Sequence, residues 1–322
     1  MRVSRRLRLA MLLAGVLAVT FSPAAQASDG ITRVLTMSPP NLPESIALDN
    51  RGNMYMSVPF AHAVVKATRA GTISTIATFS TSVFPLGVRL DRKRNVFVAV
   101  AGSGIWEIPA AGGPAKQLVN QPGLWNGLAF DRGGNLFASE SHGGAVWRLG
   151  KDGTFTLWSD SSLLLGTTAA GPCGLVHPAV PSFGPLGANG IEFTKRGDLM
   201  VANTDLGTIV RIRTNFDGSA GAASVFAGPD CNLWGADGVA IDDSDKVYVA
   251  ANSKGQIDRI DPEGQVEVLA AGDPLSFPSD IAFPKAGERN QIFISNFAAF
   301  ATSAGAPGVL KIDIEERGEA ND

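Results

Sequence analysis

One pattern recurs six times along the sequence: a short apolar strand, a turn rich in Gly, Asn and Asp, and a second β-rich run. The six repeats begin at Glu44, Leu86, Asn126, Asn189, Asp237 and Ser279, at intervals of 42, 40, 63, 48 and 42 residues. Each repeat has the pattern of a β-hairpin. Further strand-like runs follow, such as AVWRL and FTLWS after the third hairpin. A period near 40 residues with four strands per unit is typical of propeller blades. The sequence therefore predicts an all-β fold, a six-bladed β-propeller of four-stranded blades.

The two ends of the repeat region predict how the ring closes. The last repeat ends with VLKIDI at 309–314, which would be its third strand, and no fourth strand follows. ITRVLTM at 31–37 precedes the first repeat and also has a strand pattern. We expect this N-terminal strand to complete the last blade, because closure removes open sheet edges. The propeller would then span residues 31–314, followed by a polar C-terminal tail at 315–322. A β-sandwich with irregular strands is the alternative.

Composition agrees with a turn-rich β protein that has a sizeable core. The chain of 322 residues is 45% hydrophobic and 18% charged, with 37 Gly and 19 Pro, which is more Gly and Pro than average. The formal net charge of −3 gives no basis for nucleic-acid binding. These values exclude a disordered polar chain and a coiled coil, and they indicate no oligomeric state.

Residues 1–27 have the pattern of a secretory signal peptide that is removed from the mature protein. Four arginines within the first eight residues precede an apolar run at 9–21, and a small-x-small cleavage pattern follows at 25–27. The apolar run is shorter than the roughly 20 residues that a membrane anchor needs. We therefore expect a secreted or periplasmic protein with no membrane association after signal removal. Arg5-Arg6 leaves both Sec and twin-arginine export open.

The two cysteines, Cys173 and Cys231, are expected to form a disulfide, because an exported protein meets an oxidising compartment. Cys173 lies in an insertion near residues 161–185, and Cys231 lies in a smaller one before the fifth repeat. Both insertions precede the first strand of a blade. A bond between them would tie two adjacent loops on one face and add roughly 3–4 kcal/mol of stability.

The residues that begin the repeats are expected to meet at one mouth of the central channel, because the first strand of every blade lines that channel. Four of the six carry a carboxylate or a carboxamide: Glu44, Asn126, Asn189 and Asp237. Such oxygen ligands suit Ca²⁺ or another hard divalent cation, which would also balance two facing carboxylates. The alternative is that Asn and Asp before Gly only set turns. Glu44 does not fit that alternative, because Glu is a poor turn former and no Gly follows it.

In their order along the blades, Glu44-Ser45, Asn126-Gly127, Asn189-Gly190 and Asp237-Gly238 resemble the SMP-30/gluconolactonase/LRE family of six-bladed propellers. The resemblance covers about residues 31–314. It implies that Glu44, Asn189 and Asp237 hold Ca²⁺ or a similar ion, and that Asn126 lies beside the ion and holds substrate. It also implies hydrolysis of lactones or esters, with Asp237 as the general base.

The chain departs from this family just before Asn126. Sugar lactonases of the family usually carry an arginine two residues before that position, where this sequence has Leu124 followed by Trp125. The apolar and aromatic pair predicts a small-molecule substrate that is less polar than a sugar lactone. Trp125 and Asn126 are the residues expected to contact it.

His142 is a second candidate for the general base, because it follows the second strand of the third blade, which returns to the same mouth. His62 and His177 are less well placed, since His62 lies in a connection of the first blade and His177 in the insertion. Asn203, Asn252 and Asn296 follow or end second strands and either line the pocket or cap turns.

Two functions of other kinds stay open beside the hydrolase. One is a non-catalytic propeller, similar to NHL-repeat proteins, that binds a ligand or a protein partner. The other is an enzyme similar to strictosidine synthase, since such enzymes share the architecture. The converging oxygens favour the hydrolase, because a scaffold has no need of them.

Overall fold

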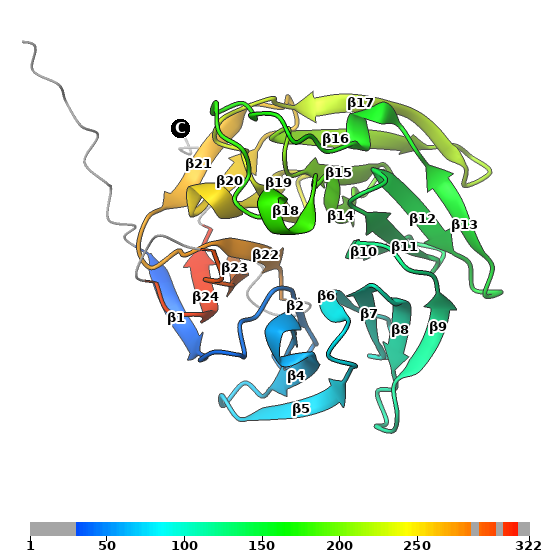
Figure 1. Ribbon diagram of the computed structural model, residues 1–322, viewed down its shortest axis with the longest axis vertical. Helices are drawn as coiled ribbons and strands as arrows, with labels where there is room; N and C mark the ends of the chain where they lie inside the picture. Colours follow the sequence, from blue (N-terminus) through cyan, green and yellow to red (C-terminus); the bar gives the residue numbers. More distant parts are fainter. Residues whose placement is uncertain (1–29, 285–289, 301–304, 315–322) are drawn as a thin grey trace, which may run out of the picture.

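The predicted repeats fold as six blades around a central channel in the computed structural model of the chain (Figure 1). The structure describes residues 30–284, 290–300 and 305–314. Within these residues the strands form six four-stranded antiparallel sheets. The fold class predicted from the repeat is therefore confirmed. The signal peptide expected at 1–27 and the tail expected at 315–322 lie outside the described residues.

Each of the first three blades consists of four consecutive strands, with the first strand innermost (Figure 1). The first blade is built from β2 (Ile46–Leu48), β3 (Met54–Val58), β4 (Ala63–Ala67) and β5 (Ile73–Thr78). The second is built from β6 (Phe84–Leu90), β7 (Val96–Ala101), β8 (Gly104–Ile108) and β9 (Lys116–Asn120). The third is built from β10 (Trp125–Phe130), β11 (Leu136–Glu140), β12 (Ala145–Leu149) and β13 (Phe155–Ser159).

The next two blades follow the same order. The fourth is built from β14 (Ala188–Phe193), β15 (Leu199–Asn203), β16 (Thr208–Thr214) and β17 (Ala220–Ala227). The fifth is built from β18 (Ala236–Ile241), β19 (Val247–Ala251), β20 (Gln256–Ile260) and β21 (Val266–Ala271). The short helices lie in connections: η1 (Pro59–Ala61), η2 (Ser162–Leu164), α1 (Val180–Phe183) and η3 (Asn252–Lys254). None of the helices in the described part of the chain is long and apolar enough to cross a membrane.

The sixth blade joins the two ends of the propeller, as the sequence predicts. Its strands are β22 (Pro278–Ala282), β23 (Gln291–Asn296), β24 (Gly308–Asp313) and, from the N-terminal side, β1 (Ile31–Thr36). β1 pairs antiparallel with β24, and Figure 1 shows the blue and red strands side by side. This pairing covers the edge that β24 would otherwise leave open.

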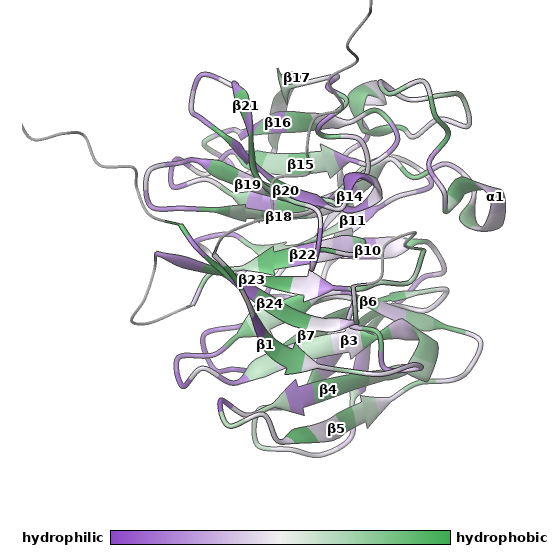
Figure 2. Cartoon of the chain, turned by 90° about the vertical axis from the view of Figure 1, so that its left-hand side faces the viewer, coloured by the Kyte–Doolittle hydropathy of each residue, from purple (hydrophilic) through white to green (hydrophobic). Residues whose placement is uncertain are grey.

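The core lies between neighbouring blades, where the apolar faces of adjacent sheets pack together. One cluster joins Val64 of the first blade to Val88 and Val98 of the second, and all three side chains are fully buried. Figure 2 shows hydrophobic residues concentrated on the strands, with many of the connections hydrophilic. Burial of apolar surface at about 25 cal/mol per Å² is the main force that holds the blades together.

The repeated Asp at the end of the first strand stabilises the hairpin turn. In the third blade, Asp131 Oδ1 accepts from the Asn135 backbone N–H at 2.8 Å, and Oδ2 accepts from the Asn135 side chain at 2.7 Å. Asp91 makes the same two bonds with Asn95 in the second blade. These carboxylates therefore serve the turn and not the channel.

The Gly that follows the channel residue in four repeats lies inside a strand, so the turn interpretation of the Asn-Gly and Asp-Gly pairs is wrong. Each Gly lies where two inner strands touch. A Cβ added at Gly87, Gly127, Gly190 or Gly238 would come within 3.0 Å of the backbone of the next blade. These glycines allow the inner strands to approach closely around the channel.

The close approach predicts the effect of Gly190→Ala. The added Cβ would meet the Asp237 carbonyl, so the variant should lose about 2 kcal/mol or more of unfolding free energy, measured by urea titration with circular dichroism. Gly153→Ala is the control, because nothing lies within 4 Å of its Cβ position and only its φ of 83° adds strain, about 1 kcal/mol. Equal losses in the two variants would contradict this account.

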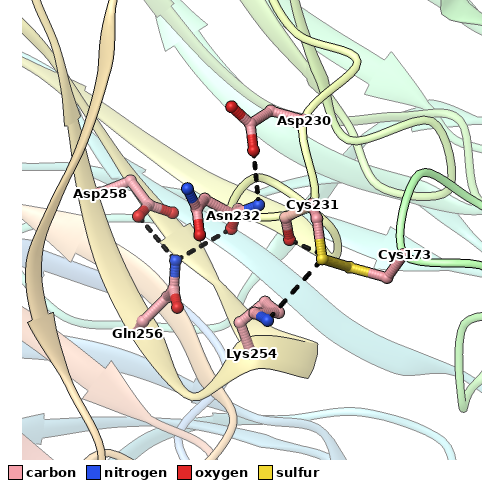
Figure 3. The surroundings of a disulfide bond; sticks show 7 residues. All are labelled: Cys173, Asp230, Cys231, Asn232, Lys254, Gln256 and Asp258. Carbon is pink, nitrogen blue, oxygen red and sulfur yellow. Dashed lines mark hydrogen bonds between the residues drawn. A yellow bond between two sulfur atoms is a disulfide. The ribbon is translucent and has the colours of Figure 1, made fainter. Parts of the chain in front are cut away.

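The expected disulfide is present between Cys173 and Cys231. It joins the insertion that follows the third blade to the loop between β17 and β18 (Figure 3). The bond links two loops 58 residues apart in the sequence. It therefore fixes the insertion to the fifth blade.

A buried acid, Asp258, lies on β20 near this disulfide (Figure 3). Its side chain is fully buried, Oδ1 accepts from Gln256 Nε2 at 2.8 Å, and Oδ2 has no hydrogen-bond partner. Burial raises the pKa of Asp258 to about 8; Asp230 adds to the rise, and Gln256 and Lys254 oppose it. The folded state thus keeps a proton that the unfolded state loses near pH 4. The free energy of unfolding should therefore fall as the pH rises from about 4 to about 8.

This linkage predicts that Asp258→Asn is more stable than the wild type at pH 8 but not at pH 4. The difference should exceed ~1 kcal/mol at the higher pH, because the amide carries no charge to bury. Denaturant unfolding at a series of pH values measures it, with the exposed Asp160→Asn as the control for loss of one charge. A stability difference that stays constant with pH would show that Asp258 is ionised in the folded state.

Candidate active site at the channel mouth

The four oxygen-bearing residues expected at one mouth of the channel line a single cavity of about 450 Å³. They are Glu44, Asn126, Asn189 and Asp237. Glu44 lies in the segment just before β2, and the other three residues lie on β10, β14 and β18. In those three strands the register shifts at the channel residue, which turns the side chain out of the regular ladder. The same register shift thus places an oxygen-bearing side chain from each of three successive blades at the cavity.

The Asn189 side chain is held so that its amide oxygen, Oδ1, has no hydrogen-bond partner. Its Nδ2 donates to Thr204 Oγ1 at 2.9 Å, and that hydroxyl donates in turn to the Ala236 carbonyl at 2.8 Å. Because the Thr204 proton is committed to Ala236, its oxygen must accept, and this fixes which way the amide points. Asn189 Oδ1 is then buried without a hydrogen bond. A buried unsatisfied acceptor at a cavity is the position where a cation ligand is expected.

The two carboxylates of the cavity are costly to ionise. Burial raises the pKa of Glu44 well above its ordinary value, and the charges of Asp237 and Asp280 raise it further. Burial also raises the pKa of Asp237 to about 8, with Asp280 adding to it and the carboxamides of Asn252 and Asn189 opposing it. A divalent cation between such groups would offset their repulsion. Together with Asn189 Oδ1 they fit a hard cation with oxygen ligands.

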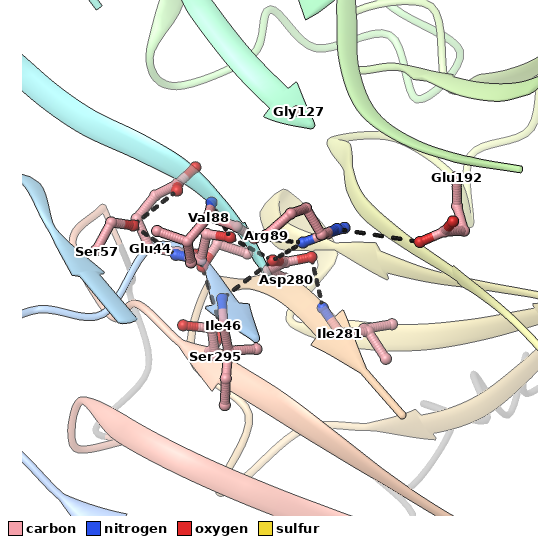
Figure 4. Close-up of polar contacts among 12 residues, drawn as sticks. Glu44, Ile46, Ser57, Val88, Arg89, Gly127, Glu192, Asp280, Ile281 and Ser295 are labelled. Atoms are coloured by element: carbon pink, nitrogen blue, oxygen red, sulfur yellow. Dashed lines mark hydrogen bonds and ion pairs between the residues drawn. The ribbon is translucent and has the colours of Figure 1, made fainter. Parts of the chain in front are cut away.

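A second polar network lies beside Glu44 in the channel and is already balanced (Figure 4). Asp280 Oδ2 accepts from Ser45 Oγ at 2.6 Å and from Arg89 Nη1 at 3.2 Å, and Arg89 Nε lies 4.0 Å from Glu192. Ser45 and Asp280 occupy the positions in the first and sixth repeats where the other four repeats have Gly. The sequence analysis did not identify Asp280 or Arg89. Arg89 gives Asp280 a counter-charge. Among the described residues, no positively charged side chain lies within hydrogen-bond distance of Glu44 or Asp237.

Of the histidines, the structure places His142 and His177 at the cavity and does not place His62 there. His142 Nε2 lies 2.5 Å from the Phe183 carbonyl, so this nitrogen carries the proton and Nδ1 is the lone-pair atom of the neutral ring. His177 is buried, and its Nε2 lies 3.0 Å from Asn252 Oδ1. The expectation that His177 is poorly placed is therefore wrong, because the insertion folds back over the channel mouth.

The three asparagines that follow second strands divide in the same way. Asn252 lines the cavity, and its Nδ2 donates to Asp237 Oδ2 at 2.9 Å. Asn203 instead donates to the Leu163 and Leu165 carbonyls, and Asn296 donates to carbonyls of other loops. Two of the three thus hold connections in place.

The structure does not bring Trp125 to the cavity, although Leu124 and Asn126 on either side of it line it. The Trp125 side chain is fully buried in the core between the second and third blades, packs on Trp147 and Phe155, and donates from Nε1 to the Gln121 carbonyl at 2.7 Å. Strand alternation accounts for this correction, because neighbouring residues point to opposite sides. The aromatic lining comes from other segments: Phe60, Phe84, Phe183, Phe277, Phe297 and Phe300.

A six-bladed propeller with an oxygen-lined channel mouth is the class of protein that the fold and site define. Residues 182–297 match the model of the SMP-30/gluconolactonase/LRE-like region, which confirms the resemblance seen in the repeats. No match was found among curated protein sequences.

Solved structures with the same fold include proteins of several activities. A gluconolactonase from Xanthomonas campestris is 17% identical, with a TM-score of 0.65 over 88% of this chain and 89% of that chain. A calcium-binding protein, regucalcin, from Agrobacterium tumefaciens is 17% identical, with a TM-score of 0.65 over 88% and 93%. A virginiamycin B lyase from Staphylococcus aureus is 15% identical, with a TM-score of 0.59 over 84% and 82%. At these identities the likeness shows the fold alone.

The site geometry predicts a cation-dependent rise in melting temperature. Adding Ca²⁺ to chelator-treated protein should raise the Tm, because a ligand that binds only the folded state stabilises it. Glu44→Gln and Asp237→Asn should each abolish most of this rise, and the exposed Asp160→Asn should keep it. Differential scanning calorimetry measures the shift. A full rise in either site variant would show that the residue is not a ligand.

Proposed function

We propose that this protein is a divalent-cation-dependent hydrolase of lactones or esters that carry an apolar substituent. The observation that carries the proposal is the unpartnered, buried oxygen of Asn189 beside the two buried carboxylates Glu44 and Asp237. Such a set is expensive to bury without a cation and is suited to binding one. The family match favours the lactonase-type reaction over others that use the same fold.

In this proposal Glu44, Asn189 and Asp237 hold Ca²⁺ or another hard divalent cation. The chemistry supplied by such a cation is polarisation of the substrate carbonyl and stabilisation of the negative charge that develops on it. Asn126, which is half-buried at the same cavity, orients the substrate through its carboxamide. A general base must also take a proton from the attacking water.

His142 is the stronger candidate for that base. Its Nε2 is engaged by the Phe183 carbonyl, which leaves Nδ1 of the neutral ring to accept a proton. Asp237, the base implied by the family resemblance, accepts a hydrogen bond from Asn252 and would also bind the cation. A carboxylate engaged in both ways is a weak base.

The cavity walls support a substrate that is less polar than a sugar lactone. Leu124 lines the wall near Asn126, and phenylalanine rings from the first, second and sixth blades and from the insertion line the rest. Sugar hydroxyls placed against these rings would lose hydrogen bonds to water without replacement. An alkyl or aryl group would instead gain from burial there.

A non-catalytic ligand-binding propeller is the second candidate. The engagement of Asp237 by Asn252 favours it, because His142 is then the remaining candidate base among the described residues that line the cavity. We also propose that the protein is exported and acts in an oxidising compartment. The disulfide between Cys173 and Cys231 supports export, because such bonds persist outside the cytosol.

The hydrolase proposal predicts turnover of aryl esters and alkyl-substituted lactones by the mature protein. EDTA should abolish the activity and Ca²⁺ should restore it. Gluconolactone should be hydrolysed with a kcat/KM at least about tenfold lower, which corresponds to ~1.4 kcal/mol of lost transition-state binding. A pH-stat assay measures all three substrates. No turnover in protein that has bound Ca²⁺ would contradict the hydrolase and favour the binding propeller.

The same assay separates the two candidate bases. His142→Gln should lower kcat by about a hundredfold, as expected for loss of a general base, while leaving Ca²⁺ affinity unchanged. Full activity in this variant would leave Asp237 as the base.

A further inference from the structure

Three side chains form a continuous chain of hydrogen bonds from the insertion to the carboxylate of Asp237. His177 Nε2 lies 3.0 Å from Asn252 Oδ1, and Asn252 Nδ2 lies 2.9 Å from Asp237 Oδ2. All three side chains are buried, with exposed fractions of 3%, 4% and 6%. This series of hydrogen bonds therefore runs through the protein interior beside the cavity and not over the protein surface.

The direction of each hydrogen bond is fixed by its surroundings. The backbone N–H of Ala179 donates to His177 Nδ1 at 3.3 Å, so the ring proton lies on Nε2 and donates to Asn252. Burial lowers the pKa of His177, which agrees with a neutral ring. Asn252 must turn its NH₂ group toward the carboxylate, and its Oδ1 then accepts from both His177 and the Ser253 hydroxyl at 2.9 Å. His177 thus donates to Asn252, and Asn252 donates to Asp237.

His177 is itself held in place by the insertion that carries it. Its ring packs edge-on against Trp234, at 6.3 Å between centroids, and lies 6.2 Å from the ring of Phe277. Four residues earlier, Cys173 bonds to Cys231 on the loop that leads to β18. The insertion is thus fixed at the disulfide and at the aromatic contacts on either side of the cavity.

We propose that His177 is a positioning residue for cation binding, which acts through Asn252 to hold the Asp237 carboxylate toward the cavity. This inference rests on the proposed function, because it takes Asp237 as a cation ligand. It assigns a role to the insertion, which the propeller does not need for its six sheets. It also makes the geometry of the site depend on the disulfide that fixes the insertion.

Removing the donor at His177 should weaken cation binding without removing any ligand. Without it, the Ser253 hydroxyl is the remaining donor to Asn252 Oδ1, so the amide is held less firmly beside the carboxylate. Groups that orient a metal ligand in this way are typically worth 10–100-fold in affinity. His177→Phe keeps the ring shape without a donor, whereas His177→Gln keeps a donor on a flexible chain.

The test is a calorimetric titration of Ca²⁺ into chelator-treated mature protein. We expect His177→Phe to raise the Kd about tenfold and His177→Gln to restore it to within a fewfold of the wild type. His62→Phe is the matched control, because His62 bonds the Val83 carbonyl and does not itself line the cavity, and the Kd of this variant should not change. A wild-type Kd in His177→Phe would overturn the inference and leave the proposed function standing. No Ca²⁺ binding by the wild type would overturn both.

A second variant guards against a folding defect in His177→Phe. Asn252→Leu removes both hydrogen bonds of the series, to His177 and to Asp237, and should raise the Kd for Ca²⁺ at least as much as His177→Phe does. Adding His177→Phe to Asn252→Leu should then raise the Kd no further, because the two residues act through one connection. Additive effects would show that His177 acts by another route.

Discussion

The close approach of inner strands at the channel is the constraint on which the rest of the structure depends. At Gly87, Gly127, Gly190 and Gly238 the backbone of the next blade lies where a side chain would begin. This contact brings the preceding residue of each strand to the same mouth of the channel. The register shift at the same point in β10, β14 and β18 then turns that residue toward the cavity.

The close approach of the inner strands also brings buried carboxylates near one another. Their charges are balanced differently at Asp280 and at the channel mouth. Beside Glu44, the Asp280 carboxylate has Arg89 as a counter-charge, and the Ser45 hydroxyl and two backbone N–H groups also donate to it. At the mouth, the side-chain hydrogen bonds to Glu44 and Asp237 come from neutral groups, the Ser57 hydroxyl and the Asn252 carboxamide. The first arrangement is complete within the chain. We propose that a cation completes the second, because paired buried carboxylates are otherwise strongly unfavourable.

Much of this architecture could be predicted from the sequence because a propeller repeats its local pattern. The period located the inner strands, and with them Glu44, Asn126, Asn189 and Asp237, and the unmatched strands at the two ends showed how the ring closes. The repeat carries no such information for segments outside it. His177 lies in an insertion whose path depends on the disulfide and on aromatic contacts, and so its approach to Asn252 could not be predicted.

Two further misses have local causes. Trp125 and Asn126 are neighbours, but strand alternation places the indole in the core and the carboxamide at the cavity. Asp280 is adjacent to Ser279, the residue that the repeat placed at the mouth, and a shift of one position decides which of them meets the channel network. Ser279 instead donates to the Glu44 carbonyl at 2.5 Å. In both cases the error is one of side-chain direction and not of strand position.

The central claim is that the inner strands assemble one cation site from distant oxygens. A crystal structure grown with Mn²⁺, with anomalous diffraction recorded at the manganese edge, tests it most directly. The account predicts a single strong anomalous peak within about 2.5 Å of side-chain oxygens of Glu44, Asn189 and Asp237. A channel mouth without a peak, or a peak bound only by other residues, would contradict it.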